Sequence, residues 1–98
     1  MNNETNQKFI IRTDRAGVFF GEIAERRGTE ADLVNVRRLY YWNGATECFG
    51  LATSGVTKPN DCKFTVTVPC VTVTGVIEVI HCSDKAVQSI ESVKAWTA

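Results

Sequence analysis

The segment Ala31-Asp32-Leu33-Val34-Asn35-Val36-Arg37-Arg38-Leu39-Tyr40-Tyr41-Trp42 is long and rich in arginine and aromatic residues towards its end. Its β-branched and aromatic residues predict a long strand, and Asn43-Gly44 ends it because both residues tolerate a positive φ. Successive side chains of a strand point to opposite faces. One face is expected to hold Arg38, Tyr40 and Trp42, and the other Arg37, Leu39 and Tyr41. Each face then carries at least one ring and one arginine.

Further strands are predicted on both sides of this stretch. Before it, residues 8–13 and 18–25 form a hairpin around a turn that contains Asp14, Arg15 and Gly17. Gly21 predicts a bulge or a bend in the second of these strands. After it, residues 62–68 alternate apolar side chains with threonine. Pro69 then requires a bend, a bulge or an edge position, and residues 70–74 and 76–81 complete the sheet.

Two helices are predicted in the second half of the chain. A short one lies between residues 46 and 55 and ends at Gly55. The other runs from Asp84 to about Ala95, with Ser83 as its N-cap. These elements indicate an α+β domain with a curved, mainly antiparallel sheet of five or six strands, either open or closed as a small barrel. Residues 1–7 are expected to be a disordered polar tail, and residues 8–98 a single domain.

Composition excludes several classes of protein. A hydrophobic share of 44% in 98 residues is that of a globular domain and argues against disorder. The 11 basic and 11 acidic residues give a formal net charge of zero, so non-specific binding to nucleic acid is not expected, because that needs many cationic contacts to phosphates. The N-terminus is polar and no apolar run is long enough to cross a bilayer. We therefore expect no membrane association and a cytoplasmic location.

Residues that commonly perform catalysis are scattered. His81 and Cys82 are adjacent in an expected strand, so they face opposite sides and cannot act together as base and nucleophile. We expect His81 to be structural. The four cysteines lack a Cys-x-x-Cys pair and are most simply small core residues, although their even number leaves disulfides open. The chain contains no phosphate-binding glycine loop, esterase elbow or zinc-protease motif. We therefore expect no enzyme activity, no cofactor and no metal.

What remains is a binding surface of arginines, aromatic rings and amides. Arginine forks pair with phosphates, and each stack of a base on a ring contributes about 1–3 kcal/mol. The candidate ligand contacts are Arg12, Arg15, Arg37, Arg38, Tyr40, Trp42, Asn43 and Asn60. They favour a small anionic nucleotide as ligand. Two alternatives remain open: the same residues could bury the surface of a partner protein, and Trp42 could belong to the core.

The C-terminal helix also predicts self-association. So short a helix is marginal on its own and must pack against something, either the sheet of its own chain or the same helix of a second copy. Trp96, close to the end of the chain, favours a contact that orders the tail. We expect a homo-oligomer.

The sequence resembles a family of small, uncharacterised phage and prophage proteins. The resemblance rests on Ile11-Arg12-Thr13, on Ala16 to Gly21, on Val36 to Ala45 and on Pro59 to Phe64, and it extends from Phe9 to about Lys94. In this family an Arg-x-x-x-Ala-Gly-Val hairpin precedes an Ala-Arg-Arg-aromatic-Tyr-Trp-x-Gly-Ala strand and a Cys-Lys-Phe strand. Here Val36 replaces the usual alanine, and Asp14-Arg15 replaces an aromatic-serine pair. These departures weaken what the resemblance implies about Arg15 as a ligand contact.

More loosely, the chain is similar to phage "sponge" proteins that sequester nucleotide signals of host immunity. Such sponges are oligomers that hold their ligands between subunits. The two resemblances imply a phage or prophage origin and a location in the cytosol of the bacterial host. They also imply binding of a cyclic ADP-ribose isomer, as made by Thoeris-type defences, or of a cyclic oligonucleotide, as made by CBASS-type defences.

Overall fold

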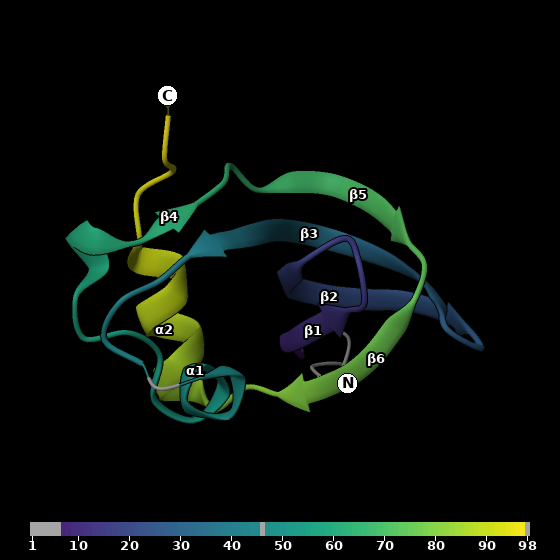
Figure 1. The fold of residues 1–98 in the computed structure, drawn as a ribbon, viewed down its shortest axis with the longest axis horizontal. Coiled ribbons are helices and arrows are strands. Elements are labelled where there is room, and N and C mark those ends of the chain that lie inside the picture. The colour runs from purple at the N-terminus through teal and green to yellow at the C-terminus, as the bar shows by residue number, and fades with distance from the viewer. Residues whose placement is uncertain (1–6, 46, 98) are drawn as a thin grey trace.

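The computed structural model describes residues 7–45 and 47–97. Their elements are, in chain order, β1 (Phe9–Thr13), β2 (Val18–Arg27), β3 (Glu30–Tyr41), α1 (Cys48–Ser54), the 3-10 helix η2 (Pro59–Asp61), β4 (Lys63–Phe64), β5 (Val68–Val73), β6 (Val76–His81) and α2 (Asp84–Ser92). The predicted α+β class is confirmed, with a short inserted helix and a helix near the C-terminus (Figure 1). Most of the predicted N-terminal tail lies outside the described residues.

The six strands form one antiparallel sheet. Its order is β4-β3-β2-β1-β6, and β5 pairs with β3 on the same side as β4. The register places Leu39 opposite Phe64 and Val36 opposite Val68, so β4 and β5 follow one another along β3. Figure 1 shows β5 and β6 arching around the end of the sheet that lies away from the helices. Within the described residues β5 and β6 pair with β3 and β1 but not with each other, so the sheet is open.

The pairing of β2 with β3 contains a bulge that requires Gly21. Between the pairs Phe20–Arg37 and Glu22–Val34, β3 contains one more residue than β2, and Asn35 in this stretch has a φ of 48°. A Cβ on Gly21 would lie 2.8 Å from the Cβ of Val36, so only glycine permits this close approach. The bulge predicted at Gly21 is therefore present, and its extra residue is on the neighbouring strand.

The sheet buries both of its faces. One face packs with α1 and α2 in a helix-side core that includes Ile10, Phe20, Leu39, Leu51, Phe64 and Ile90. The other face closes on itself in a curl-side core that contains Ile11, Phe19, Ala31, Leu33, Val36, Val73 and Val76. Ile10 pairs with Phe20 and Ile11 pairs with Phe19. Strand alternation in a single hairpin therefore supplies both cores.

The predicted helix ends are confirmed except for the last. Gly55, with a φ of 76°, ends α1, and Ser83 caps α2 by accepting a hydrogen bond from the backbone N–H of Ala86 at 3.1 Å. However, α2 ends at Ser92 and not near Ala95. The tail leaves the helix because Ala95 forms a parallel bridge with Phe64. The N–H of Trp96 also donates to the Phe64 carbonyl at 2.8 Å. None of the helices in the described residues is long and apolar enough to cross a membrane.

The single strand predicted over residues 62–68 is wrong. β4 contains only Lys63–Phe64, and the chain then loops away, with the Val66 side chain 54% exposed. Three residues, 65–67, lie opposite only two on β3, so the ladder cannot continue. Pro69 lies in β5, where it faces solvent.

The cysteines also differ in part from expectation. All four are free, and Cys48, Cys62 and Cys82 are buried as expected of small core residues. Burial raises the pKa of the Cys82 thiol to about 11. Cys70 is exposed on β5, so the prediction of a core position is wrong for this residue.

Candidate functional site

Arg37 and Arg38 are neighbours in sequence but have opposite environments. Arg37 is only 6% exposed. Its Nε donates to the carbonyl of Thr65 at 2.9 Å and its Nη1 to the carbonyl of Ile90 at 3.0 Å, so it joins β3 to the chain after β4 and to α2. Burial lowers the pKa of this guanidinium. Its donors are therefore occupied within the subunit, and the small part of Arg37 that is exposed lines a recess of about 170 Å³ with Lys8 and Glu91.

Arg12 also lies apart from the other predicted contacts. It is on β1, and its Nη1 donates to Oε1 of Glu78 on β6 at 2.7 Å. This hydrogen bond raises the pKa of the Arg12 guanidinium. The pair is partly exposed, with 42% and 31% of the two side chains accessible. Arg12 thus connects two strands on the far side of the sheet from β3.

Three of the predicted contacts come together around one hollow. Its volume is about 370 Å³, and Arg15, Arg38 and Tyr40 line it. Arg15 comes from the turn between β1 and β2, and the other two come from the end of β3. The pairing of Phe19 with Arg38 brings the turn beside that end of the strand. We call this the arginine hollow; Ala16, Gly17, Val18 and Leu39 complete its lining.

Arg38 has a structural contact as well as an exposed position. Its guanidinium carbon lies 5.0 Å from the centre of the Phe19 ring, so it covers the end of the curl-side core. Its backbone N–H donates to Oγ1 of Thr65 at 2.8 Å. The side chain remains exposed to solvent. It can therefore offer guanidinium donors to a ligand in the arginine hollow while resting on an aromatic ring.

A second bulge separates Tyr40 from Trp42. Between the pairs Leu39–Phe64 and Tyr41–Lys63, β3 has one more residue than β4. Strict alternation is lost there, and both Tyr40 and Tyr41 are exposed, at 64% and 48%. Trp42 is partly buried and packs against the helix-side core. The predicted face of Arg38, Tyr40 and Trp42 therefore holds for its first two members only, and Trp42 takes the alternative core position.

Trp96 joins the site although the predicted set of contacts did not include it. Its ring stacks on the Tyr40 ring with centroids 5.4 Å apart and planes at 8°. Nζ of Lys63 lies 5.4 Å from the centre of the same ring. The tail that carries Trp96 is held beside β4 by the backbone contacts described above. The only signal in the sequence was a tryptophan close to the chain end, and its ordering contact is with its own chain.

The two predicted asparagines lie together in a second hollow. Its volume is about 390 Å³, and it is lined by Tyr41, Asn43, Asn60, Asp61, Cys62, Lys63 and Trp96. We call it the amide hollow. The Cys62 thiol points at the carbonyls of Lys58 and Asn43, at 3.4 and 3.7 Å, which ties together the two loops that carry the asparagines. Asn60, Cys62 and Trp96 also line a further hollow, which includes Lys94.

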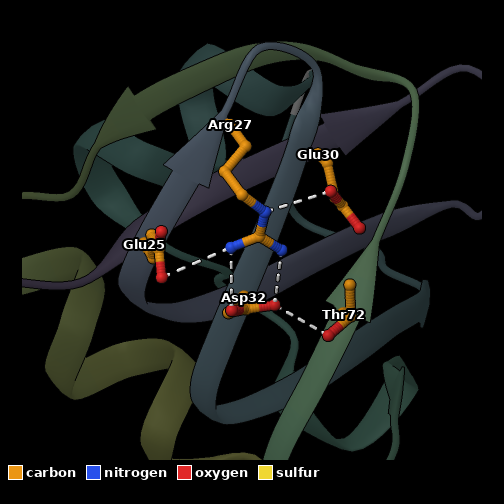
Figure 2. A network of polar contacts seen from close by, with 5 residues as sticks. All are labelled: Glu25, Arg27, Glu30, Asp32 and Thr72. Atoms are coloured by element: carbon orange, nitrogen blue, oxygen red, sulfur yellow. Dashed lines mark hydrogen bonds and ion pairs between the residues drawn. The ribbon is translucent and has the colours of Figure 1, made fainter.

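Charge is unevenly distributed between the two ends of β3. At the β2–β3 turn, Arg27 contacts Glu25, Glu30 and Asp32 at 3.1–3.4 Å, and Thr72 of β5 donates to Asp32 at 2.7 Å (Figure 2). Hydrogen bonds from Arg27 and Thr72 hold the pKa of Asp32 below its ordinary value. At the other end, Arg15, Arg38 and Lys63 form no ion pair within the described residues. The neutral chain therefore presents an unpaired cationic surface beside the exposed rings.

His81 is exposed to solvent and has one aromatic contact, so the structural role expected of it stays a prediction. It lies at the end of β6, and its ring meets the Phe9 ring edge-on with centroids 4.8 Å apart. Of the eight predicted contacts, the structure thus brings Arg15, Arg38 and Tyr40 to one hollow and Asn43 and Asn60 to the next. It places Arg12, Arg37 and Trp42 elsewhere.

Residues 6–90 match the family model described as "Domain of unknown function (DUF6948)". The chain belongs to this family. The match covers the first hairpin, whose turn supplies Arg15, and all of β3, which supplies Arg38 and Tyr40, and it ends before Trp96. No curated protein and no solved structure matches the chain.

Proposed function

We propose that this protein binds a small anionic nucleotide signal in the arginine hollow and sequesters it without turning it over. The observation that supports this most directly is the convergence of Arg15, Arg38 and the exposed ring of Tyr40 on one hollow. Guanidinium forks match phosphate oxygens in pairs. An exposed tyrosine ring offers a stacking face to a base.

The unpaired charge at this end of β3 supports the same proposal. Arg15 and Arg38 contact no carboxylate in the described part of the chain, so a ligand phosphate would not have to displace an acid. Lys63 and Lys94 add further positive charge on the neighbouring surface. Asp61 is the one acid that lines the adjoining amide hollow, and Lys63 in the same lining supplies a positive charge that offsets it.

Magnitudes indicate that one hollow alone binds weakly. One base stack and two charged hydrogen bonds provide together about 4–9 kcal/mol, from which the cost of immobilising the ligand must still be subtracted. Micromolar affinity requires about 8 kcal/mol. Sequestration therefore needs further contacts, and we propose that a second copy of the chain supplies some of them in a homo-oligomer.

The resemblance to phage proteins suggests the biological setting. The Arg-Arg-aromatic-Tyr-Trp segment on which it rests supplies Arg38 and Tyr40 to the arginine hollow. We propose that the protein originates from a phage or prophage and acts in the cytosol of the bacterial host. There it would counter a defence that signals through a cyclic ADP-ribose isomer or a cyclic oligonucleotide.

Native mass spectrometry tests this function. The purified protein is measured with a panel of cyclic nucleotides and cyclic ADP-ribose isomers, beside the double variant Arg15→Gln/Arg38→Gln. The control is Lys85→Gln, which removes one positive charge at the exposed start of α2, away from the hollow. We expect a symmetric oligomer that gains stoichiometric ligand mass, releases it unmodified on denaturation and loses this ability only in the double variant. Absence of any mass gain across the panel, or release of an altered ligand, would contradict the proposal.

A protein-interaction or assembly module is the second candidate. The observation that favours it is the exposure of Tyr40, Tyr41 and Trp96 at the same end of the molecule, beside Arg38. Aromatic rings with arginine neighbours are typical of interface hot spots. The ultraviolet spectrum of protein purified from its natural host separates the two candidates, because a captured nucleotide adds nucleobase absorbance and a protein partner adds none.

A further inference from the structure

The arginine hollow and the amide hollow share a wall. Tyr40 lines the first hollow and Trp96 lines the second, and these two rings are stacked in parallel, at 8° and 5.4 Å. Each hollow is therefore bounded by one ring of a parallel, offset pair, and the two hollows adjoin at this pair. The predicted arginine contacts therefore lie on one side of this wall, and the predicted asparagine contacts lie on the other.

The two recesses are alike in size and complementary in chemistry. Their volumes of about 370 and 390 Å³ are close to each other and at the small end of the range for small-molecule sites. The first offers two guanidinium groups and a ring. The second offers one ammonium group, from Lys63, one carboxylate, from Asp61, and the side-chain amides of Asn43 and Asn60. Amides both donate and accept hydrogen bonds, as recognition of the edge of a base requires.

We propose that the ligand consists of two joined nucleotide units, one in each hollow, with the linkage crossing the Tyr40–Trp96 wall. This inference rests on the proposed function and specifies its ligand class. In the arginine hollow, one base stacks on Tyr40 and its phosphate meets Arg15 and Arg38. In the amide hollow, the second base presents its edge to Asn43 and Asn60, and Lys63 neutralises the second phosphate.

The Tyr40–Trp96 wall is held in place by contacts within the chain itself. The backbone N–H of Trp96 donates to the Phe64 carbonyl at 2.8 Å, and Ala95 bridges to the same residue of β4. Nζ of Lys63 lies 5.4 Å from the centre of the Trp96 ring, so the ammonium group is already positioned at the second hollow. Because these groups are ordered in the free protein, binding needs little further ordering of the site.

Two linked units also explain how this surface could sequester a ligand. A single unit has too few contacts for tight binding, as estimated above. Once the first unit is bound, the second meets its hollow at an effective concentration in the millimolar range or above. The linked ligand therefore binds more tightly than either unit binds to its hollow alone.

Titration calorimetry with matched ligands tests the inference. The probes are the mononucleotides AMP, GMP, CMP and UMP, and the linear and cyclic homodinucleotides made from them. At least one dinucleotide is expected to bind the wild-type protein more than about 10-fold more tightly than its own mononucleotide.

Variants then assign the two units to the two hollows. Lys63→Gln and Asn60→Ala are each expected to weaken binding of that dinucleotide by about 10-fold. Neither should change the affinity for the mononucleotide. Arg15→Gln is expected to weaken both ligands by about 10-fold. Lys85→Gln should affect neither. Thermal unfolding of every variant confirms that it folds, and all substituted side chains are exposed.

The outcomes separate this inference from the function beneath it. A mononucleotide that binds as tightly as its dinucleotide, or a Lys63→Gln variant that weakens both equally, overturns the two-unit ligand and leaves nucleotide binding intact. If neither mononucleotides, dinucleotides nor the cyclic panel bind, the two-unit ligand and the proposed function fail together.

Discussion

The two ends of β3 carry similar residues and treat them in different ways. At the end near the β2–β3 turn, Arg27 is surrounded by three carboxylates and Thr72 fastens Asp32 to β5 (Figure 2). At the other end, Arg38 has no carboxylate partner within the described residues and lies beside two stacked rings. Charge serves structure where it is paired and is available to a ligand where it is not. A bulge at Asn35 lies between the two ends, and a second bulge, at Tyr40, lies within the end that carries Arg38.

Arg37 should give the largest effect, because its side chain forms buried hydrogen bonds although it lies next to Arg38 at the unpaired end of β3. Arg37→Leu removes hydrogen bonds to the carbonyls of Thr65 and Ile90 in a buried place. We expect a loss of about 3 kcal/mol in the free energy of unfolding, measured by urea denaturation. Arg38→Leu is the matched variant and should cost about 1 kcal/mol or less, since only the contact with Phe19 is lost. Equal losses would show that the two arginines are not divided between structure and surface.

Gly21→Ala tests the first bulge. The added methyl group would lie 2.8 Å from the Cβ of Val36, and the strands can separate only by disturbing both cores. We expect the free energy of unfolding to fall by about 2 kcal/mol. Gly28→Ala, at a φ of 61° with no heavy atom near the new methyl group, isolates the backbone effect and should cost about 1 kcal/mol. A smaller loss at position 21 than at position 28 would contradict the close approach.

Trp96→Ala tests the Tyr40–Trp96 wall at the unpaired end of β3. Removal of the stack on Tyr40 should lower the free energy of unfolding by about 1 kcal/mol, and it should leave the Tyr40 ring open to solvent. In a Trp42→Phe background, the fluorescence of Trp96 reports the same contact, and Tyr40→Ala should shift its emission towards the red. Phe49→Ala, at an exposed position on α1, serves as the control and should leave the emission unchanged. If Tyr40→Ala leaves the Trp96 emission unchanged, the stacked wall of Tyr40 and Trp96 is contradicted.

The smallest effect is expected at the paired end and depends on pH. The pKa of Asp32 is lower in the folded protein than in the unfolded chain, so its contribution to stability is complete above its ordinary pKa of about 4. That contribution is lost as the pH falls through the folded pKa. The stability difference between the wild type and Asp32→Asn, from urea denaturation at several pH values, should therefore shrink in acid. Lys85→Gln should show a constant difference from the wild type over this range, and an Asp32→Asn difference that is equally constant would contradict the network.

Much of the fold follows from local signals in the sequence. Gly55 ends α1 and Ser83 caps α2 because their backbone and side-chain chemistry acts within a few residues. The strands on either side of the first turn follow from alternation in the same way. The strand predicted over residues 62–68 failed because its continuity depends on the register against β3, and this register is set by residues far away in the sequence.

The candidate site was predictable in its residue types but not in its membership. Local sequence places arginines, rings and amides around the end of β3, since these residues are adjacent to one another or to recognisable turns. Contacts between distant segments bury Arg37 and expose Arg38, place Trp42 against the core, and bring Trp96 onto Tyr40. The physical reason is that one bulge shifts every following side chain relative to the sheet. Bulges and the docking of a tail depend on contacts between segments that no local pattern records.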